Sequence, residues 1–158
     1  MHSFVAIFGV FICFTTTIAF VENVPQLRSH RIRVGENSYF VYPDVTKNFI
    51  DSLDFCKSNN QKLAVINNQN ENAELVAQMK ILFNEDALLW IAGALIPSTG
   101  DWIWLPSRDT ITSFDWGTGE PTMKNEFCLS IKPHFFKSGT WNDQDCSTVG
   151  YPLCQTVS

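Results

Sequence analysis

The sequence predicts one domain of the α+β class. Two segments with helical periodicity come first, and short apolar runs punctuated by glycine and proline follow them. Helices and strands do not alternate along the chain, which argues against a parallel α/β sheet. The length of 158 residues suits a single domain.

Composition limits the classes of function. Charged residues make up 17% of the chain, below the roughly 25% of ordinary globular domains, which argues against a disordered protein. The formal net charge of −5 argues against a nucleic-acid surface, which needs clustered lysine and arginine. We therefore expect no nucleic-acid partner.

The first 19 residues are typical of a secretory signal peptide. No charged side chain precedes Glu22, and residues 4–20 form an almost unbroken apolar run of about 17 residues. Thr17 and Ala19 place small side chains at positions −3 and −1 of a cleavage site after Ala19. A retained signal anchor is the alternative, but the run is at the short limit of a membrane span and lacks basic flanks. We expect a secreted, extracellular protein with no membrane insertion after cleavage, and an N-terminal leader at residues 20–37.

The five cysteines fit this interpretation. Cleavage removes Cys13 and leaves an even set in an oxidising compartment, where disulfides form. The remaining four allow three pairings, and arithmetic alone does not choose among them. They are Cys56, Cys128, Cys146 and Cys154.

The first half carries the helical signals. Residues 38–42 are aromatic and β-branched, which predicts a first strand. Thr46 is the expected N-cap of a helix that runs to about Ser58 and ends at the Asn59-Asn60 pair. The expected buried face of this helix comprises Phe49, Ile50, Leu53 and Cys56.

A short strand and a second helix follow. Residues 63–66 predict a buried strand, and Asn68 or Asn70 caps the next helix. Glu71 and Glu74 lie in its first turn, where the helix dipole favours carboxylates. Its apolar face comprises Leu75, Val76 and Met79, and the helical period stops after Phe83.

The second half predicts strands and a buried set of tryptophans. The short apolar runs are residues 88–93, 102–105, 127–131 and 151–154. Trp90, Trp102, Trp104 and Trp116 have strand-like spacing, so we expect them in the core.

Oxygen-bearing side chains are concentrated between Gly117 and Cys146. The set comprises Glu120, Thr122, Glu126, Asn142 and Asp143, and we expect these residues on loops. Calcium takes six to eight hard oxygen ligands and tolerates an irregular cage. Three carboxylates crowded together without a cation would raise one another's pKa. On spacing alone, solvated loop residues are the simpler interpretation.

Trp90-Ile91-Ala92-Gly93 is followed along the chain by Glu120-Pro121 and then by Trp141-Asn142-Asp143. With these motifs in this order, the chain resembles the C-type lectin-like domain from residue 38 to the C-terminus, whose central motif the first of them matches. The other matching segments are Cys56, 62–66, Glu74, 102–104, 114–116, 126–128, Cys146 and 151–154. The resemblance implies a domain at residues 38–158, with two helices flanking small antiparallel sheets, a long loop region and two disulfides. It pairs Cys56 with Cys154 and Cys128 with Cys146, and it implies a cis Glu120–Pro121 bond.

The resemblance also implies a calcium site that binds sugar directly. Its ligands would be Glu120, Glu126, Asn142 and Asp143, with Thr122 where the family has an amide or a carboxylate. A hydroxyl is a weaker calcium ligand, so Thr122 puts the affinity in question. All five residues are predicted to contact both calcium and sugar, and glutamate in the first position favours mannose-type sugars.

Three hypotheses of function follow. The first is a secreted calcium-dependent lectin for terminal sugars of glycans or glycoproteins, in immune or cell-surface recognition. The second is a C-type lectin-like domain that binds a protein without calcium-dependent sugar recognition. The third is a glycosidase that uses Glu120 and Glu126, which we set aside because paired carboxylates alone are weak evidence of catalysis. We expect no enzyme, and homo-oligomers are one expectation because multivalent lectins gain avidity.

Overall fold

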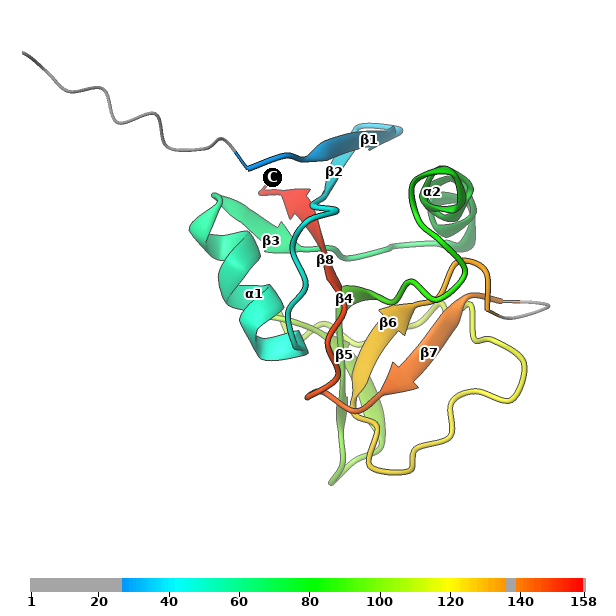
Figure 1. Cartoon of the computed structure of the whole chain (residues 1–158). Helices are drawn as coiled ribbons and strands as arrows, with labels where there is room; N and C mark the ends of the chain where they lie inside the picture. The colour runs from blue at the N-terminus through cyan, green and yellow to red at the C-terminus, as the bar shows by residue number, and fades with distance from the viewer. Residues whose placement is uncertain (1–26, 136–138, 158) are drawn as a thin grey trace, which may run out of the picture.

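The computed structural model describes residues 27–135 and 139–157 (Figure 1). The predicted signal peptide at residues 1–19 lies outside the described residues. In chain order the elements are β1 (His30–Val34), β2 (Asn37–Val41), α1 (Phe49–Ser58), β3 (Gln61–Leu63), α2 (Gln69–Leu82), β4 (Leu89–Ile96), β5 (Asp101–Trp104), β6 (Cys128–Ile131), β7 (Trp141–Gln144) and β8 (Tyr151–Thr156).

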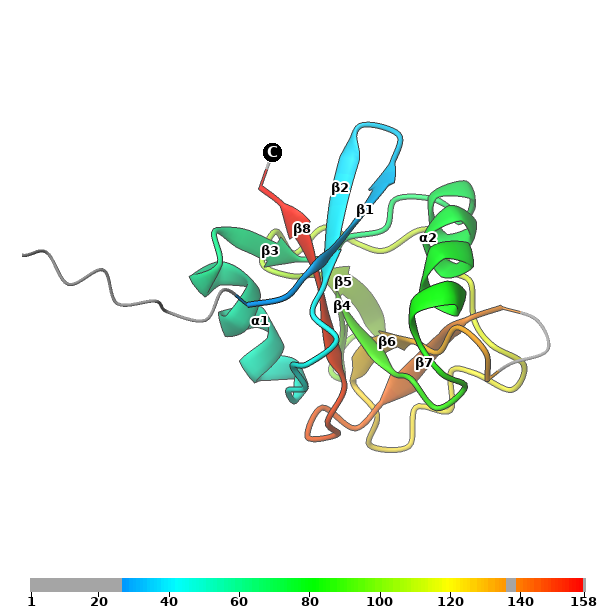
Figure 2. The same cartoon turned by 45° about the horizontal axis from the view of Figure 1, so that its top comes forward.

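A twisted sheet forms the centre of the fold. The strand order is β1-β2-β8-β4-β6-β7, with β3 paired to β8 and β5 paired to β4. The described pairs are antiparallel, except that β4 and β8 run parallel. Figures 1 and 2 show α1 and α2 on either side of this sheet, with the β6–β7 hairpin at the end opposite β1 and β2. The α+β class is therefore confirmed.

Helix α1 begins later than the sequence predicted. The side chain of Asn48, rather than that of Thr46, caps it by accepting a 2.8 Å hydrogen bond from the backbone N–H of Asp51. Phe49 and Cys56 are buried as predicted, but Ile50 is 58% exposed. The prediction for Ile50 was wrong because Ser52 occupies the buried face three residues after Phe49, and Ile50 points about 100° away from Phe49.

Helix α2 agrees with the sequence. Asn68, one of the two predicted caps, accepts a 3.0 Å hydrogen bond from the backbone N–H of Glu71. The three predicted apolar residues, Leu75, Val76 and Met79, are buried.

Residues 30–34, which the sequence pattern placed in the leader, form β1. Ile32 and Val34 are buried, while Arg31 and Arg33 are exposed on the other face. Every residue of β1 is paired with β2. Apolar and basic residues therefore alternate with the period of two that is typical of a strand, but the basic residues led us to assign the segment to the leader.

The strand predicted at 63–66 lies two residues earlier. β3 ends at Leu63, opposite Cys154, because its ladder with β8 runs from Gln61 to Leu63. Ala64 and Ile66 are nevertheless buried, and Ala64 adds one hydrogen bond to the carbonyl of Leu153.

The carboxylate of Glu71 joins the N-terminal hairpin to α2. It is 7% exposed and accepts hydrogen bonds from Tyr39 Oη (2.7 Å), Asn37 Nδ2 (2.6 Å) and the backbone N–H of Asn67 (2.6 Å). Burial raises the pKa of Tyr39 above its ordinary value, and the bond to Glu71 and the charge of Glu71 raise it further. The sequence placed Glu71 only as a first-turn carboxylate.

Two disulfides hold the fold together in the pairing that the resemblance implied. Cys56–Cys154 joins α1 to β8, and Cys128–Cys146 joins β6 to the chain after β7. Trp90, Trp102 and Trp104 are buried in the core, whereas Trp116 is half-buried. Within residues 27–135 and 139–157, no helix has the length and apolar character needed to cross a membrane.

Candidate functional site

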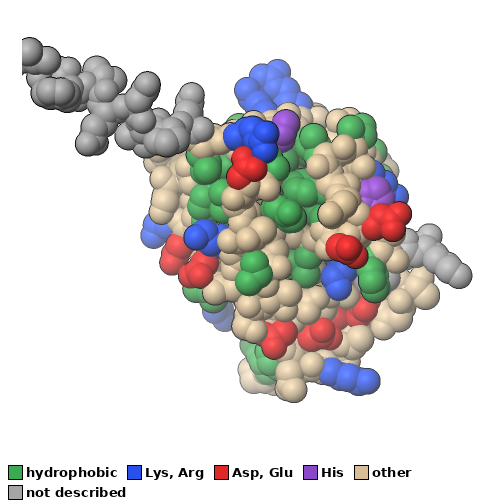
Figure 3. All heavy atoms as spheres, viewed as in Figure 1, with side chains coloured by type: hydrophobic (Ala, Val, Ile, Leu, Met, Phe, Trp, Pro, Cys, Tyr) green, Lys and Arg blue, Asp and Glu red, His purple; other side chains and the backbone are tan. Residues whose placement is uncertain are grey.

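The predicted ligands come from two segments that the sheet brings together. Glu120, Thr122 and Glu126 lie on the loop that leads into β6, whereas Asn142 and Asp143 lie in β7. Strands β6 and β7 are antiparallel neighbours. The Cys128–Cys146 disulfide then fixes the end of the loop beside the end of β7. In the lower part of the face seen in Figure 3, where these segments lie in Figure 1, acidic side chains form a row.

Asn142 and Asp143 are strand residues, which corrects the expectation that they lie on a loop. They pair with Ser130 and Leu129 of β6, and their side chains are 4% and 0% exposed. The preceding Trp141 is also buried, so the hairpin places the whole motif in the sheet. The sheet, rather than a flexible turn, therefore sets the positions of these two side chains.

Asp143 holds the loop in place. Its Oδ1 accepts a 2.9 Å hydrogen bond from the backbone N–H of Thr122, and its Oδ2 accepts a 2.6 Å bond from that of Met123. Met123 has a positive φ of 55°, so the chain turns sharply just after Thr122. Both carboxylate oxygens of Asp143 thus have a backbone partner.

Glu120 is the least satisfied of the predicted ligands. Its Oε2 is buried and has no hydrogen-bond partner among the described residues. Burial raises the pKa of Glu120, and a hydrogen bond that the protonated group shares with Asp143 raises it further. The charges of Asp143 and Glu126 act in the same direction, while Lys132 opposes them. The Glu120–Pro121 peptide bond is cis, as the resemblance implied.

Thr122 and Glu126 contact each other directly. The Thr122 hydroxyl donates a hydrogen bond to Glu126 Oε2. The two predicted ligands are thus hydrogen-bonded to each other. Thr122 therefore closes a short turn of the loop onto Glu126, four residues later.

The amide of Asn142 is directed along its own strand. Its Nδ2 donates to the backbone carbonyl of Asp143 at 2.6 Å and to Gln144 Oε1 at 3.1 Å. The sequence did not single out Gln144. Its position two residues after Asn142, on the same side of a strand, is the signal that identifies it.

A buried network behind the site was also missed. Asn72 of α2 accepts a 2.8 Å hydrogen bond from Trp141 Nε1. Its Nδ2 donates to Asp115 Oδ2 at 2.7 Å and to Thr140 Oγ1 at 3.0 Å. Asn72 is three residues before Leu75 on the apolar face of α2, so its buried position could have been inferred from periodicity. The network positions Trp141, which directly precedes Asn142.

The donor set fits a hard cation in its chemistry. It offers carboxylate, amide and hydroxyl oxygens, and the buried unpartnered Oε2 of Glu120 is an oxygen that a cation could satisfy. Within the described segments, no group of three or more histidine, cysteine, aspartate or glutamate side chains is arranged to hold a metal ion.

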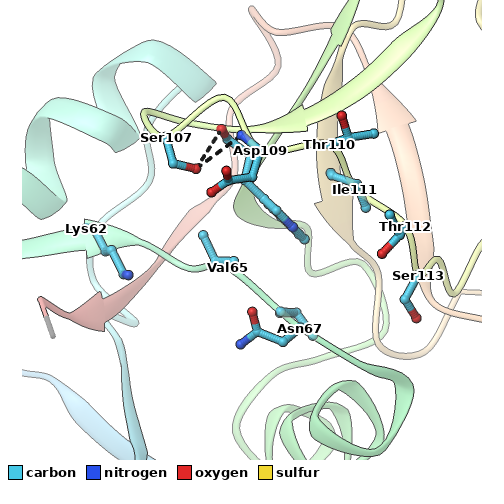
Figure 4. Close-up of a pocket in the computed structure, with 11 residues that line it drawn as sticks. Lys62, Val65, Asn67, Ser107, Asp109, Thr110, Ile111, Thr112 and Ser113 are labelled. Carbon is cyan, nitrogen blue, oxygen red and sulfur yellow. Dashed lines mark hydrogen bonds between the residues drawn. The ribbon is translucent and has the colours of Figure 1, made fainter.

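A separate polar pocket lies beside Trp104, and none of the five predicted ligands lines it. It has a volume of ≈ 380 Å³. In Figure 4 Ser107, Thr110, Thr112 and Ser113 lie on one side of the pocket, and Val65 and Asn67 lie on the other. The pocket therefore belongs to a different part of the surface from the predicted site.

A family comparison identifies the fold. The family model of the lectin C-type domain matches residues 45–156. Rat L-selectin (Rattus norvegicus) is 34% identical over 125 residues, which cover 74% of this chain and 32% of L-selectin. C-type lectin 16 of Aedes aegypti is 25% identical over 123 residues, covering 73% of this chain and 80% of that protein. The chain thus spans about a third of the length of L-selectin and most of the length of the mosquito protein.

Solved structures agree with the family model. The C-type lectin domain of murine dendritic cell inhibitory receptor 2, in complex with N-glycan, has a TM-score of 0.70 at 22% identity, covering 81% of this chain and 96% of that chain. SPL-1, in a GlcNAc complex, has a TM-score of 0.69 at 20% identity, covering 84% and 96%. At these identities the likeness shows the fold.

Proposed function

The chain belongs to the C-type lectin domain family, and we propose that it is a secreted, calcium-dependent lectin for terminal sugars of the mannose type. The family is generally composed of non-enzymatic carbohydrate-binding proteins. One observation carries the proposal: Glu120 Oε2 is buried without a partner beside the carboxylates of Asp143 and Glu126. A divalent cation would pair this oxygen and remove the repulsion.

The residues that would hold calcium are the five predicted ones. Glu120, Glu126 and Asp143 would contribute charge, and Asn142 and Thr122 would contribute neutral oxygens. Bound calcium would supply a centre to which two neighbouring sugar hydroxyls can coordinate. The carboxylates would then accept hydrogen bonds from those hydroxyls, and the amide and the threonine hydroxyl would donate hydrogen bonds to them.

Solved neighbours and two sequence features support the proposal. Two neighbours of the same fold were solved with an N-glycan and with GlcNAc. Glutamate at position 120 favours mannose-type sugars by the family pattern, and the signal-like residues 1–19 favour secretion. A role in immune or cell-surface glycan recognition would follow from these properties.

A second candidate function has its own observation in its favour. The loop is already closed by hydrogen bonds, since Asp143 accepts two backbone N–H groups and Thr122 donates to Glu126. A loop whose polar groups form hydrogen bonds with the protein itself needs no cation to pair them. This suits a C-type lectin-like domain that binds a protein without calcium.

Affinity retention separates the two candidates. The disulfide-bonded protein is passed over mannose, N-acetylglucosamine and galactose resins in millimolar calcium and is then eluted with a chelator. The lectin proposal expects retention on mannose and a melting temperature that rises with calcium. Asn142→Ala should abolish retention, while the exposed Asn70→Ala should not. Retention on none of the resins, with no effect of calcium on melting, would favour the protein-binding alternative.

A further inference from the structure

A larger cavity lies on another part of the surface. It has a volume of ≈ 590 Å³ and is lined by α1, β3, residues 105–108 and Val157. None of the predicted calcium ligands lines it. Small-molecule sites usually measure roughly 300–1,000 Å³, so the cavity is large enough for a ligand.

The floor of this cavity is apolar. Leu63 is buried, Leu53 and Leu105 are half-buried, and Val157 is 65% exposed. With Pro106 they line the cavity, and all of them except the buried Leu63 present hydrocarbon to solvent. Covering this surface with an apolar group removes it from water, which is favourable.

Three cations line the cavity, and one of them, Lys62, also lines the pocket beside Trp104. Lys57 comes from α1, Lys62 from β3, and Arg108 from the segment after β5, with Asp54 as the single acid in the lining. Among the described residues the ion pair of the structure joins Arg28 to Asp44, so these three cations have no carboxylate partner there. A chain with a net charge of −5 thus concentrates three of its 11 lysines and arginines around one apolar cavity.

The backbone at Arg108 forms a defined turn beside the cavity. Arg108 has a positive φ of 67°, a conformation that residues other than glycine rarely adopt. Its backbone N–H donates a 2.8 Å hydrogen bond to the carbonyl of Trp104, which stabilises the turn.

We propose that this cavity binds a small anionic amphiphile, with an alkyl or aromatic body and one carboxylate or phosphate head. The body would cover the leucines, and the head would pair with the three cations. A neutral amphiphile would leave the cations unpaired, and a small hydrophilic anion would leave the apolar floor in water. A free fatty acid and a lysophospholipid both present this chemistry.

The test titrates the protein with decanoate, decanoyl lysophosphatidate and 1-decanol. Calorimetry measures the affinity of each compound, and methyl NMR of the leucine and valine side chains locates its binding site. We expect saturable binding of one or both anions, at least tenfold tighter than that of 1-decanol. The tighter anion identifies the source of the head group. The shifted methyl signals should be those of Leu53, Leu63, Leu105 and Val157.

Charge variants make the test specific. The double variant Lys57→Gln and Lys62→Gln should weaken binding of the tighter anion at least tenfold and leave 1-decanol binding unchanged. The matched control is Lys47→Gln with Lys80→Gln, two exposed lysines outside the cavity, which should change neither. Affinities of both anions no higher than that of 1-decanol, an unchanged affinity for the tighter anion in the cavity double variant, or methyl shifts confined to other regions would each overturn the proposal.

Discussion

The backbone N–H of Thr122 donates a 2.9 Å hydrogen bond to Oδ1 of Asp143, across 21 residues of sequence. The bond ties a surface loop to a carboxylate whose position the β6–β7 hairpin fixes. The adjacent N–H of Met123 binds the other oxygen of the same carboxylate. Asp143 therefore orders the loop through two adjacent backbone N–H groups.

Replacing Asp143 should affect both the loop and the proposed ion site. In Asp143→Asn one backbone N–H faces an amide NH₂ instead of an oxygen, so we expect the free energy of unfolding to fall by about 1–3 kcal/mol. The rise in melting temperature with calcium should disappear. Denaturation with calcium and with chelator measures both effects. The exposed Asp86→Asn is the control, and a calcium response that survives in Asp143→Asn would contradict a role for Asp143 in the ion site.

The effect of Glu120→Gln on the melting temperature should change sign when calcium is added. The pKa of Glu120 is raised in the folded state, so ionisation of this group costs stability as the pH rises above its unfolded pKa. In chelator at neutral pH the variant should therefore melt at a higher temperature than the wild type, and the difference should vanish below about pH 4. With calcium the variant should melt at a lower temperature, because a charged ligand is lost. A variant that is less stable in both conditions would show that repulsion at Glu120 is unimportant.

Thr122→Asn tests the departure from the family pattern. An amide oxygen reaches further than a hydroxyl and is a better calcium ligand, so calcium affinity should increase. Calorimetric titration with calcium measures the change, and Thr46→Asn, at an exposed position outside the site, serves as the control. Equal affinities of wild type and variant would mean that position 122 does not contribute to ion binding.

Tyr39→Phe should alter the alkaline stability of the protein. The variant loses the hydroxyl that donates to Glu71, which should cost about 1–2 kcal/mol at neutral pH. Because the pKa of Tyr39 is raised in the folded state, the wild type loses stability as the pH rises above about 10. The difference between wild type and variant should therefore shrink at high pH. Urea denaturation at several pH values measures it, with Tyr151→Phe as the control, and a constant difference would contradict this account.

Asn72→Ala should weaken the site from a distance. The change leaves Trp141 Nε1 and the Asp115–Thr140 pair without their buried partner, so we expect a loss of about 2–3 kcal/mol of stability. Asn142 follows Trp141, so sugar retention should weaken even at temperatures where the variant remains folded. Asn70→Ala on the exposed side of α2 should alter neither property. Normal retention in folded Asn72→Ala would restrict this network to stability alone.

The sequence predicted best where periodicity and capping act locally. Helix α2 has the predicted cap at Asn68 and the predicted apolar face, because both depend on neighbours within the helix. The buried face of α1 was harder to predict, because Ser52 is buried there while the more apolar Ile50 is exposed. Which side of a short helix meets the sheet depends on partners distant in sequence.

The sequence identified the candidate site residues but did not predict how they are arranged. Asn142 and Asp143 looked like turn residues, yet they lie in a strand because β6 supplies a ladder partner that local pattern does not reveal. The buried Glu71 was also beyond local reasoning. Its four donors come from the β1–β2 hairpin and from the segment before α2, so only the assembled fold shows why a carboxylate is buried there.

The placement of β1, β2 and β8 has a practical consequence. The first described residue and the end of β8 lie at the same end of the molecule, whereas the loop before β6 lies at the other end (Figure 1). A tag or surface linker attached beside residue 27 or residue 157 would therefore orient the loop toward the solution. Protein immobilised at that end should keep the loop accessible to large glycoproteins, so arrays of such molecules can be used for avidity measurements.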